Sequence, residues 1–150
     1  YESIANGIQG KLESYLSVKE YKVEMDAEQI IIRLDPRAFF EPGDFTINPV
    51  QVEFFQEMAD LLTTKRSGLY LTAEVEVNAA PSEAENYQQR ADVLAGRRAT
   101  IFTRALMERG VPPTHLTAEV IENQEPAVNL VINIHVQDAQ KAINSLDGLY

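Results

Sequence analysis

The chain has 150 residues, of which 45% are hydrophobic and 24% are charged, with a formal net charge of −10. This length fits one domain with a sizeable core, and the composition is typical of a globular protein rather than a disordered one. The acidic charge argues against nonspecific binding to nucleic acid or to an anionic membrane, because both would be repelled. The absence of cysteine excludes disulfides, thiolate metal sites and a cysteine nucleophile.

The first part of the chain predicts a helix, a pair of strands and a second helix. Apolar residues recur every four positions at the start and indicate an amphipathic helix within residues 1–19. Residues 21–25 and 29–34 then predict a hairpin or two adjacent strands, and residues 35–48 a loop. Asn48 precedes Pro49, which is typical of a helix start, with a capping side chain followed by proline in the first turn.

The second part of the chain predicts strands on either side of a long helix. Residues 69–77 alternate apolar and polar side chains, as in a strand with one buried face. Ser82 with Glu85 three residues later has the spacing of a capping box, so we expect a helix from there to Arg109, ended by Gly110. The remaining predicted elements are two strands, at 116–121 and 128–136, and a closing helix that begins at residue 137.

The alternation of helices and strands predicts an α/β (α+β) sandwich with helices packed on one face of a sheet. No internal repeat or linker divides the chain. We therefore expect a single domain over residues 1–150, with an N-terminal helix in 1–19, a core in 20–136 and a C-terminal helix in 137–150.

Residue patterns for catalysis or metal binding are missing. His115 and His135 have no ligand-like spacing to carboxylates, and the chain has no phosphate-binding loop or nucleophile motif. Glu74 and Glu76 share one face of a predicted strand, whereas glycoside cleavage requires carboxyl groups on opposite sides of a bond. The sequence therefore predicts no enzyme, no metal and no cofactor.

Arg98 stands out because it lies on the apolar stripe of the predicted helix, close to Leu94 and Ile101. A desolvated guanidinium needs a hydrogen-bonded anion, and its planar fork suits a carboxylate. Two partners are open: Glu74 or Glu76 on the preceding strand, or the carboxylate of a bound ligand.

The order of motifs between residues 23 and 136 resembles the OmpA-like peptidoglycan-binding domains, in particular the MotB branch of flagellar stator proteins. The segment from Phe40 to Pro49 is similar to the F-x-x-G-x-x-x-L-x-P entry to the first conserved helix of that family. The segment Leu94-Ala-Gly-Arg-Arg-Ala99 resembles the L-S-x-x-R-A signature, with Ala95 in place of the usual serine. The interval from Asn78 to Leu94 suits the longer insertion of MotB-like members.

This resemblance implies a mixed sheet and a site that clamps the zwitterionic end of diaminopimelate in the wall peptide. In the family, an aspartate takes the ammonium and the signature arginine takes the carboxylate, so Arg98 keeps its role. Asn78 stands in the aspartate position and lacks the charge, and Asn129 remains where N-R-R-V would begin, although both arginines are lost. The ligand-binding residues implied by the resemblance are Arg98, Asn78, Leu94, Ala95 and Asn129.

The resemblance further implies a non-catalytic periplasmic domain that anchors or positions a stator-like, ion-driven envelope complex at the peptidoglycan. Wall binding is expected to be weak, altered or absent because the site is partly degenerate. The expected partners are peptidoglycan, a MotA-like membrane subunit and a second copy in a homodimer, with an inner-membrane anchor missing from this chain. Two alternatives remain open. One is a degenerate module that acts through protein–protein contact or dimerisation, and the other, more distant, is a wall-processing enzyme that uses Glu74 and Glu76.

Overall fold

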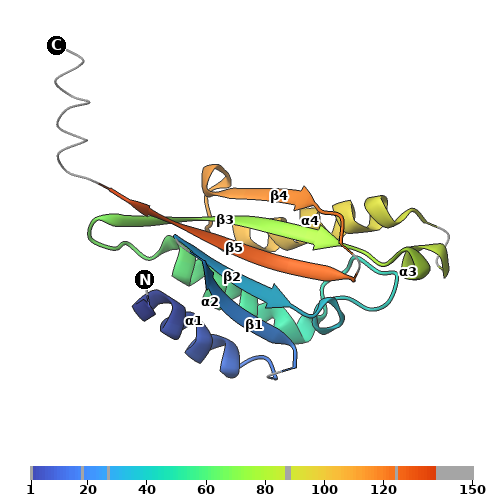
Figure 1. Ribbon diagram of the computed structural model, residues 1–150, viewed down its shortest axis with the longest axis horizontal. Helices are drawn as coiled ribbons and strands as arrows, with labels where there is room; N and C mark the ends of the chain where they lie inside the picture. The colour runs from blue at the N-terminus through green and yellow to red at the C-terminus, as the bar shows by residue number, and fades with distance from the viewer. Residues whose placement is uncertain (1, 18, 27, 87–88, 124, 138–150) are drawn as a thin grey trace, which may run out of the picture.

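The computed structural model describes residues 2–17, 19–26, 28–86, 89–123 and 125–137 (Figure 1). The predicted C-terminal helix over 137–150 lies outside these residues, apart from residue 137. In chain order the elements are α1 (Glu2–Glu13), β1 (Tyr21–Asp26), β2 (Gln29–Leu34), η1 (Pro36–Ala38), η2 (Pro49–Gln51), α2 (Val52–Thr63), β3 (Leu69–Asn78), α3 (Pro81–Asn86), α4 (Ala91–Met107), η3 (Pro113–His115), β4 (Leu116–Val120) and β5 (Ala127–Val136).

The strands form one mixed five-stranded sheet in the order β1-β2-β5-β3-β4. Strands β1 and β2 form the predicted hairpin, with Tyr21 opposite Leu34. Strand β5 lies antiparallel between β2 and β3, whereas β3 and β4 are parallel. The connection between β3 and β4 carries α3 and α4, as a crossover between parallel strands requires. The predicted fold class, a mixed sheet with helices, is thus confirmed.

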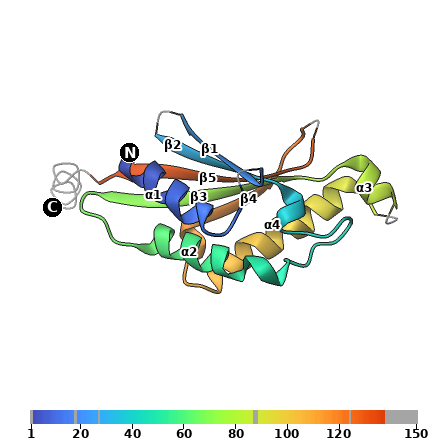
Figure 2. The ribbon, with the colours of Figure 1, turned by 90° about the horizontal axis from the view of Figure 1, so that it is seen from below.

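The helices α1, α2 and α4 lie on one side of the sheet (Figure 2). On β3, alternate residues such as Val75 and Val77 are fully buried beneath these helices, while Glu74 and Glu76 point to the opposite face. Strand β5 is central, and its residues 127–132 are buried on both faces. Among the described residues, no helix covers the second face of the sheet.

Four phenylalanines form the centre of the core between α2, α4 and the segment that leads to α2. Phe39, Phe54, Phe55 and Phe102 have ring centroids 4.7–6.2 Å apart, mostly in edge-to-face arrangements. Such ring pairs stabilise the folded state beyond the stabilisation that burial of the rings already provides. This cluster fixes α4 against the segment at 39–45, which is the pairing that builds the candidate site.

The sequence predicted one helix from Ser82 to Arg109, and this prediction is wrong in one respect: the structure has two helices in this segment. α3 begins at Pro81, so Ser82 lies inside its first turn rather than capping it, and it ends at Asn86. α4 begins at Ala91 and ends near the predicted glycine: Gly110 has a φ of 106°, and the backbone N–H of Val111 donates to the carbonyl of Leu106. None of the helices in the described part of the chain is long and apolar enough to cross a membrane.

Candidate functional site

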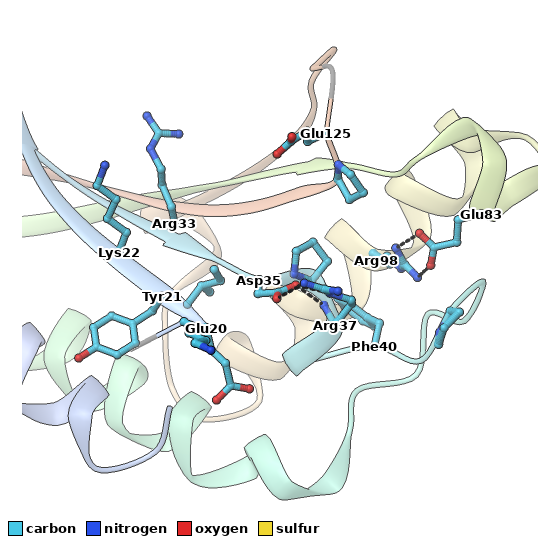
Figure 3. Close-up of a pocket in the computed structure, with 15 residues that line it drawn as sticks. Glu20, Tyr21, Lys22, Arg33, Asp35, Arg37, Phe40, Glu83, Arg98 and Glu125 are labelled. Carbon is cyan, nitrogen blue, oxygen red and sulfur yellow. Dashed lines mark hydrogen bonds and ion pairs between the residues drawn. The ribbon is translucent and has the colours of Figure 1, made fainter. Parts of the chain in front are cut away.

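A cavity of about 910 Å³ lies where the start of β1, the end of β2, η1 and the start of β5 meet α3 and α4 (Figure 3). Charged side chains of both signs dominate its wall. The lining residues are Lys19, Glu20, Tyr21, Lys22, Arg33, Leu34, Asp35, Pro36, Arg37, Phe40, Pro42, Glu83, Arg98, Glu125 and Pro126. Of the five site residues predicted from the sequence, Arg98 alone lines this cavity.

Arg98 projects from α4 into the wall of the cavity and is only 1% exposed. Its Nε donates to the carbonyl of Asp44 at 2.8 Å, and its Nη2 donates to the carbonyl of Glu41 at 3.3 Å. The guanidinium also lies over the ring of Phe40, 5.1 Å from the centroid. A buried cation needs this dense set of acceptors, since an unpaired one would be strongly destabilising.

Glu83 of α3 supplies the anion for Arg98. Its Oε2 accepts from Nη1 of Arg98 at 3.2 Å and its Oε1 accepts from Nη2, the forked geometry that suits a carboxylate and a guanidinium. The Glu83 side chain is 18% exposed. Burial alone would raise the pKa of this carboxyl, but the hydrogen bonds from Arg98 and from the backbone of Gly43, together with the Arg98 charge, lower the pKa below its ordinary value.

The segment at 41–44 is held between α3 and α4 by the same network. The N–H of Gly43 donates to Oε1 of Glu83 at 2.7 Å, and Nε2 of Gln89 donates to the carbonyl of Gly43 at 2.7 Å. Gly43 has a φ of 74°, a left-handed conformation that a residue with a side chain rarely adopts. The ion pair therefore fixes one wall of the cavity as well as neutralising Arg98.

A second cationic group, Arg37, lines the cavity from the turn that follows β2 and lies near the centre of the view in Figure 3. Nη2 of Arg37 donates to Oδ2 of Asp35 at 3.0 Å, and the backbone N–H of Arg37 donates to Oδ1 at 3.0 Å. Although burial alone would raise the pKa of Asp35, these hydrogen bonds lower it. The Arg37 side chain is 85% exposed, so it is far more accessible to an approaching anion than Arg98.

The two predicted asparagines do not line the cavity, and their amide groups donate to partners within the chain. Nδ2 of Asn78 donates to the carbonyls of Asn123 and Glu125 at 3.1 and 2.7 Å, and thus holds the β4–β5 loop. Nδ2 of Asn129 donates to Oε1 of Glu76 at 3.4 Å on the uncovered face of the sheet. An ionised aspartate at position 78 could not make these contacts, because a carboxylate has no N–H to donate to a carbonyl.

Leu94 and Ala95 are buried in the core, with 0% and 1% exposure, and contribute packing rather than cavity surface. Arg98 pairs with neither Glu74 nor Glu76, the two partners considered from the sequence. Sequence reasoning missed Glu83 entirely, because its role depends on the break between α3 and α4. The described residues contain no group of three or more histidine and acidic side chains arranged to hold a metal ion.

The arrangement is an arginine fork that receives a carboxylate, and here the carboxylate is the chain's own. An external carboxylate reaches Arg98 only by replacing Glu83, which requires α3 or the Glu83 side chain to move. The surrounding wall offers accessible cations of the kind that attract an anionic group to the cavity mouth.

Comparison with known proteins identifies the family of the chain. The model of the OmpA family matches residues 39–132, which include Arg98, Glu83, Asn78 and Asn129. No curated protein matches the chain in sequence.

Solved structures with the same fold come from several bacteria. The periplasmic domain of Helicobacter pylori MotB matches with a TM-score of 0.66 at 17% identity, over 88% of this chain and 98% of that one. A MotB-like protein of Desulfovibrio vulgaris matches with a TM-score of 0.69 at 14% identity, over 89% and 94% of the two chains. The cell wall anchor of the T6SS of Pseudomonas aeruginosa matches with a TM-score of 0.67 at 13% identity, over 88% and 97%. With the family model covering more than half of its length, the chain belongs to the OmpA family.

Proposed function

We propose that the chain is a non-catalytic module that positions a cell-envelope complex at the peptidoglycan. Membership of the OmpA family supports this function, as does the likeness of the fold to a T6SS cell wall anchor and to MotB periplasmic domains. The observation that carries the proposal is Arg98, the signature arginine of the family resemblance, which lies in the wall of a cavity of about 910 Å³. Stem peptides of the wall bear carboxylates, which a guanidinium fork binds in pairs of hydrogen bonds.

Binding at this site is proposed to be weak in the resting state. Glu83 already occupies the fork of Arg98. The free energy of binding a wall carboxylate there is therefore only the difference between its interactions with Arg98 and those of Glu83. The Asn78 amide is committed to the β4–β5 loop and supplies no charge for the ammonium of a zwitterionic ligand.

The finer parts of the proposal follow from the family resemblance. The domain, with residues 20–136 as its core, would lie in the periplasm, tethered to the inner membrane by a segment outside this chain. Its complex would be stator-like and ion-driven, with a MotA-like membrane subunit and a second copy of this chain as partners.

The test is co-sedimentation of the purified domain with diaminopimelate-type peptidoglycan at two salt concentrations. Glu83→Gln removes the competing charge, so we expect it to sediment more than the parent, with the gain reduced at high salt. Glu85→Gln is the matched control, because Glu85 lies on the same short helix, is exposed and does not line this cavity. Circular dichroism checks that each variant is folded.

If folded Glu83→Gln binds no better than the parent, wall binding through Arg98 is wrong. The release of soluble muropeptides by the parent, abolished by Glu76→Gln, would contradict the absence of catalysis.

A specific observation favours the second candidate, a module that acts by protein–protein contact or dimerisation without wall binding. The polar groups of Arg98, Asn78 and Asn129 all have partners within the chain. This candidate predicts that neither the parent nor Glu83→Gln sediments with peptidoglycan, while analytical ultracentrifugation shows self-association.

A further inference from the structure

The exposed surface of α4 carries an open groove of about 520 Å³ whose lining shares no residue with the Arg98 cavity, and Gly96 in this lining lies beside Val120 of the edge strand β4. One face of the helix forms its floor, since its residues follow each other at intervals of three and four. The groove is lined by Phe45, Val93, Gly96, Arg97, Thr100, Ile101 and Arg104.

The two arginines of the groove lack the partners that other arginines of the chain have. Within the described residues, the guanidinium groups of Arg97 and Arg104 form no hydrogen bond or ion pair, and the guanidinium of Arg97 lies 5.1 Å from the centroid of the Phe45 ring. Every other arginine side chain donates to a carboxylate or a carbonyl: Arg33, Arg37, Arg66, Arg90, Arg98 and Arg109.

This absence is notable because acidic residues outnumber basic ones, 23 to 13. In such a chain most arginines have a carboxylate or carbonyl nearby, and the two that have none lie seven residues apart on one helix face. Seven residues of helix span about 10 Å, so the pair presents two cations two turns apart.

Gly96 directly precedes Arg97, also lines the groove, and is not required by the packing of the domain. A Cβ built on Gly96 would meet only Cγ2 of Val120, at 3.9 Å, which is ordinary van der Waals contact. A glycine inside a helix is about 1 kcal/mol less favourable than alanine. Glycine at this position therefore leaves a shallow place on the helix surface where another backbone can approach closely.

Apolar surface surrounds these groups. Val93, Met107 and Val120 are 40%, 38% and 43% exposed. The groove thus combines apolar contact area, a site of close approach and two cations. Nonspecific binding to a membrane or a nucleic acid would require a broad basic surface, which a chain of net charge −10 lacks.

We propose that this groove docks an acidic α-helix of a partner protein, with two carboxylates about two turns apart that reach Arg97 and Arg104. A small residue of the partner helix lies above Gly96, because small side chains at a helix contact allow the shorter distances of the usual 8–10 Å range between helix axes. The proposal is independent of wall binding at Arg98.

The probe is a synthetic helical peptide with two glutamates seven residues apart and alanine at the other positions of the same face, compared with the same peptide carrying glutamines. Titrated into the ¹⁵N-labelled domain, the glutamate peptide is expected to shift amide signals between residues 93 and 104 and to bind more weakly at high salt. The combined variant Arg97→Gln, Arg104→Gln should lower its affinity about tenfold. Arg90→Gln is the matched control, because Arg90 is exposed at the start of the same helix and pairs with Asp92.

Gly96→Ala separates a docking role from a structural one. Because the added methyl group fits, we expect the Gly96→Ala domain to melt at a higher temperature than the parent and to bind the peptide more weakly. A fall in the melting temperature would mean that the fold itself needs the glycine. Equal binding of the glutamine peptide, or no peptide binding, overturns the proposal. Self-association that Gly96→Leu abolishes would make a second copy the occupant and would overturn it as well.

Discussion

Replacement of Glu83 by glutamine measures the ion pair that fills the candidate site. The amide keeps the shape of the side chain but leaves Arg98, which is 1% exposed, with the backbone carbonyls of Glu41 and Asp44 as its acceptors. Removal of one partner of a fully buried pair costs about 3–5 kcal/mol. Glu83 is 18% exposed and the amide oxygen can still accept, so we expect a loss of about 2–3 kcal/mol in the free energy of unfolding. For a domain of this size, that loss lowers the melting temperature by roughly 5–10 °C.

The effect depends on pH in a direction set by the pKa of Glu83. Hydrogen bonds from Arg98 and Gly43 outweigh burial and hold this pKa below its ordinary value of 4.5 in the folded chain. The stabilisation is therefore fully present above the pKa of the unfolded chain and is lost as the pH falls through the lower folded value. The difference in stability between the parent and Glu83→Gln should be largest near neutral pH and should shrink as Glu83 becomes protonated.

Urea denaturation of the parent and the variant at pH about 7 and about 3 tests both statements. Glu85→Gln makes the same chemical change at an exposed position of the same helix and should stay within about 0.5 kcal/mol of the parent at neutral pH. If Glu83→Gln matches this control at neutral pH, or if its deficit is equal at both pH values, the ion pair does not stabilise the domain as argued.

Two further predictions concern other parts of the chain. Asn78→Asp should destabilise the domain by about 1–2 kcal/mol in urea denaturation, because its carboxylate would face two loop carbonyls. The control Asn48→Asp should be neutral, since Asn48 caps η2 with an oxygen. An Asn78→Asp variant of undiminished stability that binds peptidoglycan more tightly would instead mean that residue 78 faces the cavity. Leu12→Ala should lower the free energy of unfolding by about 2–4 kcal/mol, because Leu12 is fully buried. Gly10→Ala, on the open face of the same helix, should raise it by roughly 0.5–1 kcal/mol. An unchanged melting temperature for Leu12→Ala would mean that α1 does not pack on the domain in solution.

The strands could be predicted from the sequence because burial imposes a period of two on them. The apolar residues of 69–77 alternate with polar ones, and β3 covers Leu69–Asn78 with alternate residues buried. The start of α2 was also foreseeable, although Asn48 caps the 3-10 turn η2, which then leads into the α-helix at Val52. Local rules succeeded at these positions because the decisive contacts lie within a few residues in sequence.

The partner of Arg98 could not be predicted in the same way. In one continuous helix, residues 83 and 98 would be separated by about 22 Å along the axis, far beyond the reach of their side chains. The two meet because the chain leaves the helical path after Asn86 and starts a new helix at Ala91. Neither glycine nor proline lies between these residues, so the sequence carries no simple signal of the break. The contact of Gly43 with Glu83, across 40 residues, is equally invisible to local patterns.

The neighbouring arginines of α4 show how one short motif can serve two surfaces. Successive residues of a helix point about 100° apart, so Arg97 and Arg98 cannot share an environment. Arg98 turns into the cavity wall, where Glu83 neutralises it, while Arg97 stays outside over Phe45 with no carboxylate. A buried cation must have an anion for the domain to fold, whereas an exposed one is stable in water without one. The inner position is therefore filled by the chain itself, and the outer position leaves its charge available to a partner.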